Sequence, residues 1–292
     1  MSSKTYYERL LELATALFET GDYLTFSDAM EEVVREHLAE AFLAGAEDVL
    51  PPEYPEQPII TTTLQQLRDQ GVVSEEDEKL PDSAKIALVA LIALTIGSIP
   101  SLATFILNKR SGYNVTISSL NDALRYLNAG NSSFSVLSLG MAQQSAIGIG
   151  GDLAGSIAKI SIDVQNGVQD ISLAVQRSTE KAQQIIGRNI LGKVDLWHSG
   201  YLNAINQGKL LSSSDETRLK WNLGQREHCQ SCLKLSGKVK TAIYWREAGV
   251  GPQAGPQGSL PNLNLDCKGY KCGCFFTVTD DSLSPGDLPS LP

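Results

Sequence analysis

The chain has no cysteine in its first 228 residues, and all five of its cysteines lie in the last quarter. Aromatic residues are sparse at 7%, and there are only three histidines. No nucleophile elbow, phosphate-binding loop or paired-histidine metal motif is present. The sequence therefore does not indicate a common hydrolase or a nucleotide-binding enzyme. We therefore expect that the chain is not an enzyme.

The N-terminal residues contain no apolar stretch of the kind found in a secretory signal peptide, so we do not expect export to an oxidising compartment. Net charge is −9 overall, with −14 over residues 1–83 and +5 over the remainder. Between Arg218 and Lys271 there are nine basic and three acidic residues. This basic region is compatible with non-specific contact to packaged DNA, with an acidic neighbour in an assembly, or with a solvated basic face.

The cysteines fall into two clusters, Cys229-x-x-Cys232 and Cys267 with Cys272 and Cys274. Two close clusters separated by a loop are typical of a structural zinc site, because zinc takes about four thiolate or imidazole ligands at tetrahedral corners. Two disulfides with one free thiol, or five uncoordinated thiols, are the alternatives. We expect a structural Zn²⁺ ion that closes a loop with little core of its own.

The sequence offers one cysteine more than a tetrahedral site needs. The set that we expect first consists of Cys229, Cys232, Cys267 and Cys272. Cys274 competes with Cys272 for the last position. His228 is a weaker candidate, because a histidine beside a cysteine more often points away from the metal.

The residues around the cysteines follow an ordered pattern: a tryptophan, an acidic residue, Cys-x-x-Cys, Leu-x-Gly, a Pro/Gly loop and Cys-x-Cys. These places are filled by Trp221, Glu227, Cys229, Cys232, Leu235, Gly237, Pro252, Cys272 and Cys274. The pattern resembles the C-terminal module of minor head proteins of tailed bacteriophages, the head-morphogenesis family that includes the F protein of phage Mu. Many members carry a histidine shortly before Cys-x-Cys, where Cys267 stands here at a longer spacing. The likeness covers residues 197–278 and, faintly, residues 26–45.

This resemblance implies a structural virion protein, a minor capsid protein in the phage head that is assembled in the bacterial cytoplasm. Its expected role is in capsid assembly, DNA packaging or DNA delivery near the portal. Capsid or portal proteins are the implied partners, and packaged DNA is a possible non-specific one.

The rest of the chain predicts a mainly α fold, with long helices and a small zinc-stapled α+β module at the C-terminus. Gly21-Asp22 separates two N-terminal helical patterns, and Ser119 to Asp122 reads as a capping box that opens a short helix closed by Gly130. The expected regions are N-terminal helices (1–50), an acidic linker (51–83), a hydrophobic helical segment (84–130), a long amphipathic helix (131–196), the Cys-rich zinc-binding module (197–280) and a flexible tail (281–292).

Residues 86–107 form a run of 22 residues without a charge, long enough for a transmembrane helix. Gly97 and Pro100 interrupt this run near its middle, which favours two helices buried in a core or at a subunit interface. Membrane contact through residues 86–107 remains the alternative, and it carries the second functional hypothesis: a membrane-active helical toxin or ejection protein.

The longest regular pattern is an apolar stripe that steps by three and four residues from Leu153 to Val175 and extends to Ile190. It predicts one helix of near 40 residues, about 60 Å long at 1.5 Å per residue. A narrow stripe on so long a helix is typical of a coiled-coil seam, so we expect a homo-oligomer or a larger partner to cover it.

Overall fold

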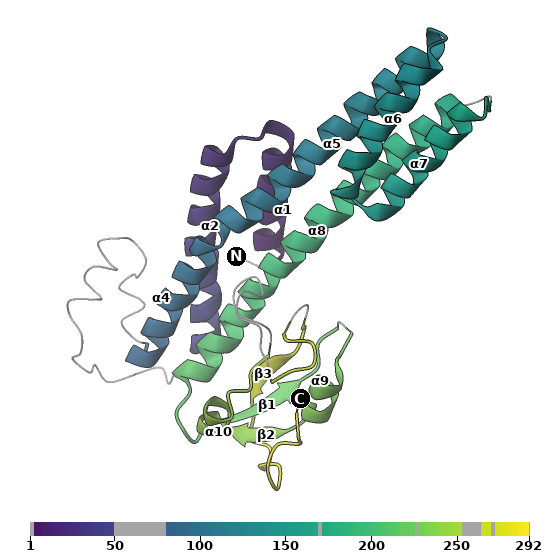
Figure 1. Cartoon of the computed structure of the whole chain (residues 1–292). Coiled ribbons are helices and arrows are strands. Elements are labelled where there is room, and N and C mark those ends of the chain that lie inside the picture. The colour runs from purple at the N-terminus through teal and green to yellow at the C-terminus, as the bar shows by residue number, and fades with distance from the viewer. Residues whose placement is uncertain are drawn as a thin grey trace. The chain divides into compact units, whose positions relative to one another are not determined.

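The structure, a computed structural model, describes residues 3–49, 80–168, 171–225, 227–252, 264–269 and 272–291 (Figure 1). It confirms a mainly α fold with long helices and a small sheet near the C-terminus. The helices are α1 (Ser3–Thr20), α2 (Tyr23–Glu47), α4 (Asp82–Gly97), α5 (Ile99–Asn128), α6 (Ser132–Ile147), α7 (Gly151–Gln165), α8 (Ile171–Ser212), α9 (Gln230–Leu235) and α10 (Ala242–Glu247). The strands are β1 (Arg218–Asn222), β2 (Val239–Thr241) and β3 (Phe275–Val278).

The chain divides into two compact units, each assembled from segments far apart in the sequence. Unit 1 comprises Met1–Leu10, Asp28–Ile99 and Val194–Pro292, and unit 2 comprises Leu11–Ser27 and Pro100–Lys193. The domain boundary predicted at residue 197 therefore falls inside α8, because the last turns of this helix fold together with the Cys-rich module. Most of the predicted acidic linker, residues 51–79, lies outside the described residues.

In unit 2, the prediction of one unbroken helix through residues 153–190 is wrong. The pattern is divided between α7 and α8, and Gly167 between them adopts φ 68°, a left-handed conformation that favours glycine and ends a helix. The Nζ atom of Lys181 on α8 donates a hydrogen bond to the carbonyl oxygen of Asp152 at 2.9 Å, so the two helices run antiparallel (Figure 1).

This hairpin changes the meaning of the apolar stripe. The α7 part of the stripe is fully buried within the unit, and it consists of Leu153, Ile157, Ile160 and Val164. The chain's own helices, α6 among them, cover it. This part of the stripe is thus an internal core. It is not available as the seam of a homo-oligomer.

The predicted capping box at Ser119 is also absent, because α5 continues through it without a break. Ser119 is buried inside the helix beside Leu120, so side-chain packing outweighs the local capping signal. The helix ends where predicted: Gly130 adopts φ 71°, and its backbone amide donates to the carbonyl oxygen of Leu127.

In unit 1, α2 and α8 cross at backbone distance because each contributes a glycine. A Cβ atom placed on Gly45 would lie 2.0 Å from the carbonyl oxygen of Ile205, and one placed on Gly208 would lie 2.0 Å from that of Phe42. These two glycines let the helices approach more closely than any side chain would permit.

The charge-free run 86–107 is divided as predicted: α4 ends at Gly97, and α5 begins at Ile99. One face of α4 is buried, whereas Ile86 and Leu94 on its other face are 63% and 44% exposed. Within the described residues, the stretch from Asp82 to Asn128 is long and apolar enough to cross a membrane by length and composition. The apolar window in it is 39% buried.

The C-terminal module is built on a three-stranded antiparallel sheet in which β1 lies between β2 and β3 (Figure 1). Lys220 pairs with Val239 of β2, and Trp221 pairs with Phe276 of β3. Leu219 and Trp221 are fully buried, as the period-2 alternation of a half-buried strand requires. The helices α9 and α10 each lie next to β2 in the chain, and α10 packs against it.

The residues of the expected flexible tail, 281–292, include several that contact the module. The backbone amide of Ser284 donates to the carbonyl oxygen of Val239, and the Nζ atom of Lys240 donates to the carbonyl oxygen of Ser284 at 2.9 Å. Leu288 and Leu291 pack against the core of the module. These residues supply both apolar cover and hydrogen bonds at the edge strand β2.

Candidate metal centre

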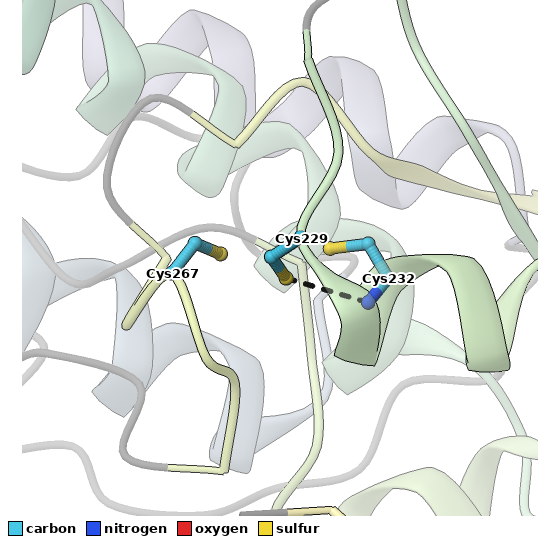
Figure 2. A group of neighbouring side chains, drawn as sticks. All are labelled: Cys229, Cys232 and Cys267. Carbon is cyan, nitrogen blue, oxygen red and sulfur yellow. Dashed lines mark hydrogen bonds between the residues drawn. The ribbon is translucent and has the colours of Figure 1, made fainter.

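The first pair of cysteines sits at the start of α9, which the sequence folds into a single tight turn. Cys229 is the N-cap residue, and its Sγ atom accepts a hydrogen bond from the backbone amide of Cys232 at 3.4 Å (Figure 2). Cys232 lies in the first turn of the helix and is buried. The x-x spacing therefore brings both sulfur atoms to the same side of the turn, as a metal site requires.

The loop before the second cluster is fastened to α9 by one carboxylate. The Oδ2 atom of Asp266 accepts hydrogen bonds from both the backbone amide and the hydroxyl of Ser231, each at 2.8 Å. The Ser231 hydroxyl in turn accepts from the backbone amide of Asp266 at 3.0 Å. This reciprocal pairing holds the neighbouring Cys267 beside Cys229 and Cys232 (Figure 2). This role of Asp266 was not predicted. Its only signs in the sequence are the serine inside Cys229-x-x-Cys232 and the aspartate directly before Cys267.

Cys272 and Cys274 lie directly before β3 and reach the cluster because two glycines bring the backbone together. A Cβ atom on Gly224 would lie 2.0 Å from the carbonyl oxygen of Gly273. The segment after β1 can therefore pass directly over the Cys-x-Cys turn. Both cysteines are buried, at 4% and 0% exposure.

The five predicted cysteines converge, and none of these five residues is part of a disulfide. Their sulfur atoms form two groups in which every member lies within 4.8 Å of the others. One group consists of Cys229, Cys232 and Cys267, and the other consists of Cys232, Cys272 and Cys274. Cys232 is common to both groups and is therefore the centre of the cluster. These clusters could hold a metal ion.

The spacing of the sulfur atoms fits a tetrahedral ion. Zinc–sulfur bonds of about 2.3 Å in tetrahedral geometry put neighbouring sulfur atoms about 3.8 Å apart. The Sγ atoms of Cys232 and Cys272 are 3.9 Å apart. Thiolates are soft ligands, and a set of soft ligands at this spacing suits zinc better than magnesium or calcium, which prefer oxygen.

Hydrogen bonds among the cysteines change the pKa values of three of them, and two are shifted toward the thiolate form. Hydrogen bonds to Cys267, Cys272 and Cys274 raise the pKa of Cys232, which acts as the donor. Hydrogen bonds from Cys232 and then Cys267 lower the pKa of Cys272 to about 7. Hydrogen bonds from Cys232 and then Cys272 lower the pKa of Cys274 to about 4. A metal ion needs thiolates, and two of the five are therefore favoured before it binds.

His228 faces the cluster, although the sequence ranked it as the weakest candidate. Its Nδ1 atom lies 3.8 Å from the Sγ atom of Cys274, and its Nε2 atom lies 3.1 Å from the carbonyl oxygen of Gly224. A carbonyl oxygen can only accept, so the pairing places the ring proton on Nε2 and leaves the Nδ1 lone pair facing the thiols. Such a carbonyl partner is typical of a metal-bound histidine.

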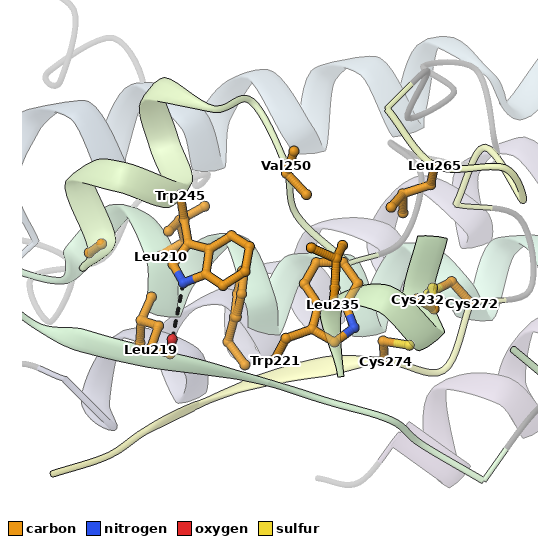
Figure 3. Packing of buried hydrophobic residues seen from close by; sticks show 12 residues of the cluster. Leu210, Leu219, Trp221, Cys232, Leu235, Trp245, Val250, Leu265, Cys272 and Cys274 are labelled. Atoms are coloured by element: carbon orange, nitrogen blue, oxygen red, sulfur yellow. Dashed lines mark hydrogen bonds between the residues drawn. The ribbon is translucent and has the colours of Figure 1, made fainter. Parts of the chain in front are cut away.

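Beneath the cysteines lies an aromatic core that positions the sheet and α9 (Figure 3). The ring centroids of Trp221 and Phe276 are 5.6 Å apart, and those of Trp245 and Phe276 are 5.2 Å apart. The indole nitrogen of Trp245 donates to the carbonyl oxygen of Leu219 at 3.0 Å. Cys232 and Cys274 belong to this core, so a metal ion held by them would stabilise the same structure as the packing does.

The module is fixed to α8 by two polar side chains that sequence reasoning missed. The backbone amide of Phe276 donates to Oδ1 of Asn206 at 2.9 Å, and its carbonyl oxygen accepts from Nζ of Lys209 at 3.1 Å. Lys209 also forms an ion pair with Asp48 at 2.6 Å, although its side chain is only 9% exposed. A buried lysine is uncommon unless it is paired, and here it joins α2, α8 and β3.

Comparison with known protein families, with curated proteins and with solved structures finds no match to this chain.

Proposed function

We propose that the Cys-rich module binds one structural zinc ion and that the chain is a structural protein of a tailed-bacteriophage head. The observation that carries the first part is the convergence of five cysteine thiols from two distant segments, in two groups whose sulfur atoms lie within 4.8 Å of one another. The Sγ atoms of Cys232 and Cys272, 40 positions apart, are 3.9 Å from each other, close to the spacing in a tetrahedral zinc site. Zinc closed by sulfur ligands keeps no open position for substrate, so the site stabilises the fold rather than performing chemistry.

The residues of the phage head-morphogenesis pattern support the second part, because they occupy the positions that build the module. Trp221 is fully buried in the aromatic core, and Gly237 adopts φ 73° in the turn between α9 and β2. Leu235 is fully buried beneath the cysteines. A pattern in which Trp221, Leu235 and the cysteines share one core is more specific than cysteine spacing alone.

The expected partners are capsid or portal proteins, with a role in head assembly, DNA packaging or DNA delivery near the portal. The direct test is to purify DNA-filled particles from infected cells and to measure this protein's copy number relative to the major capsid protein by quantitative mass spectrometry. A low, constant copy number in full particles supports the proposal. Absence from purified particles, with the protein recovered elsewhere in the infected cell, rules it out.

A membrane-active protein is the second candidate, and the exposed apolar side chains of α4 favour it. Ile86 and Leu94 would face lipid if the charge-free run left its unit and inserted. Fractionation of infected cells separates the two functions: a head protein sediments with particles without detergent, whereas an inserted helix stays with the membrane fraction after a high-salt wash. The exchange Leu94→Asp should release a membrane-inserted protein, because an unpaired carboxylate in lipid costs several kcal/mol.

A further inference from the structure

The helix α6 in unit 2 has its large apolar side chains on the outside. Phe134, Leu137 and Met141 are 52%, 60% and 56% exposed. Its buried face is made of small or polar residues and one leucine: Ser135, Ser138, Leu139, Ala142 and Ala146. A surface helix of a monomer normally shows the opposite arrangement, with the large apolar residues toward the core.

The buried side of α6 makes this inversion costly. The Ser135 hydroxyl is fully buried and has no hydrogen-bond partner among the described residues. A buried unsatisfied hydroxyl costs about 1–3 kcal/mol. The helix therefore turns its large side chains outward at the expense of the folded monomer, which indicates that they have a use on the surface.

The outward residues follow the spacing of a coiled-coil seam. Phe134, Leu137, Met141, Gln144 and Gly148 step by three, four, three and four positions, and all five are exposed. The first three of these residues are apolar and match the a/d positions of a heptad repeat, in which two helices pack side chains into one another. Gln144 is polar, and Gly148 is the C-cap residue that follows α6. Gly140 lies beside the seam with no atom near its Cβ position, so a second helix could approach closely there.

Charge decides what fits this surface. The chain carries no charged residue between Arg125 and Asp152, so α6 offers nothing to a basic or an acidic partner. Helices that lie on membranes are rich in lysine and arginine, and α6 has neither. Its 16 residues are also fewer than the roughly 20 needed to span a bilayer. A second copy of this chain presents the same neutral, apolar seam, without like-charge repulsion in either orientation.

We propose that two copies of the chain dimerise by packing α6 against α6 about a two-fold axis, with Phe134, Leu137 and Met141 at the centre. The proposal rests neither on the zinc ion nor on the phage role. A seam with three large apolar side chains is small, so we expect a dimer that dissociates on dilution rather than an obligate pair.

The test is sedimentation equilibrium of the full chain over a concentration series, with the double variant Leu137→Glu/Met141→Glu beside the wild type. Like charges across a two-fold seam face each other, so the variant should stay monomeric at ten times the concentration at which half of the wild type dimerises. Because both positions are exposed, the far-UV circular dichroism should remain that of the wild type. The thermal midpoint should also be unchanged when it is measured at a concentration at which the wild type is monomeric.

The matched control is Ile162→Glu, which places the same charge at a 56% exposed apolar position on α7 of the same unit. This variant should dimerise as the wild type does. Three results would overturn the proposal: a wild type that stays monomeric throughout, a double variant that dimerises normally, or loss of dimers in the control alone. Flotation of the wild type with phosphatidylcholine vesicles, lost in the double variant while no dimer is seen, would assign the seam to lipid instead.

Discussion

Replacing Cys232 with serine is expected to release the metal and to unfold the C-terminal module while the helices of unit 2 stay folded. Cys232 belongs to both groups of converging thiols, so no set of ligands drawn from either group survives its loss. The buried serine hydroxyl would replace a thiolate that a zinc ion requires. Replacing Cys232 should therefore weaken metal binding more than replacing Cys229, which belongs to one group only.

The magnitude follows from the loop that the metal closes. Cys232 and Cys272 are 40 positions apart. Treating the metal as a cross-link of these residues, the loop-closure entropy amounts to about 4 kcal/mol. Domains are stable by only about 5–15 kcal/mol, so this loss is enough to unfold a small module or bring it close to unfolding.

The assay is urea unfolding followed by tryptophan fluorescence, because Trp221 and Trp245 both lie in the core of the module. Zinc content is measured in parallel by mass spectrometry of the metal. The control is Leu233→Ser, which makes a comparable truncation on α9 at a 47% exposed position. We expect about one zinc per chain in the wild type and in the control, and none in Cys232→Ser. Equal zinc content and equal urea midpoints in the two variants would refute a structural metal held by Cys232.

Three further predictions test other parts of the structure. Gly208→Ala should destabilise unit 1 by about 1–3 kcal/mol in urea unfolding, because its methyl group would meet the Phe42 carbonyl oxygen at 2.0 Å. The control is Gly192→Ala, which has open space around it and should be neutral or stabilising by up to about 1 kcal/mol. Lys209→Met should cost about 1–3 kcal/mol in the same assay, because it leaves a buried carbonyl oxygen of β3 without its donor; no change would show that the link is dispensable. Zinc should be retained at pH 8 and released on acidification from pH 7 to pH 4. Protons then compete with the metal for Cys272, whose pKa is about 7, and next for Cys274, whose pKa is about 4. A chromogenic chelator follows the release, and retention of zinc below pH 3 would contradict thiolate ligation.

The helical character of the chain and the position of its candidate metal site could both be predicted from local sequence patterns. Helical periodicity is a local property, so it located the helices, and the breaks at Gly21 and Gly97 were visible as residues that end helices. Cysteine spacing is likewise local: Cys229-x-x-Cys232 can form its turn in any fold. These signals needed no knowledge of distant neighbours.

Which surfaces pack against each other could not be predicted from local patterns, because it depends on contacts between distant residues. The stripe from Leu153 to Val175 has one continuous period, and periodicity cannot show that Gly167 reverses the chain and folds the stripe onto its own unit. The outward seam of α6 was equally hidden, because its exposed and buried faces both lack charge and composition cannot tell them apart. The packing of neighbouring helices fixes that choice.

The candidate site shows the same division. The five cysteines were found from their spacing. The orientation of His228 depends on its hydrogen bond to the carbonyl oxygen of Gly224, which residue types alone do not reveal. The anchors Asn206 and Lys209 were also beyond local reasoning, because their partner in β3 lies 67 to 70 positions away. Residue types determine which ligands are available, and long-range packing determines which of them converge.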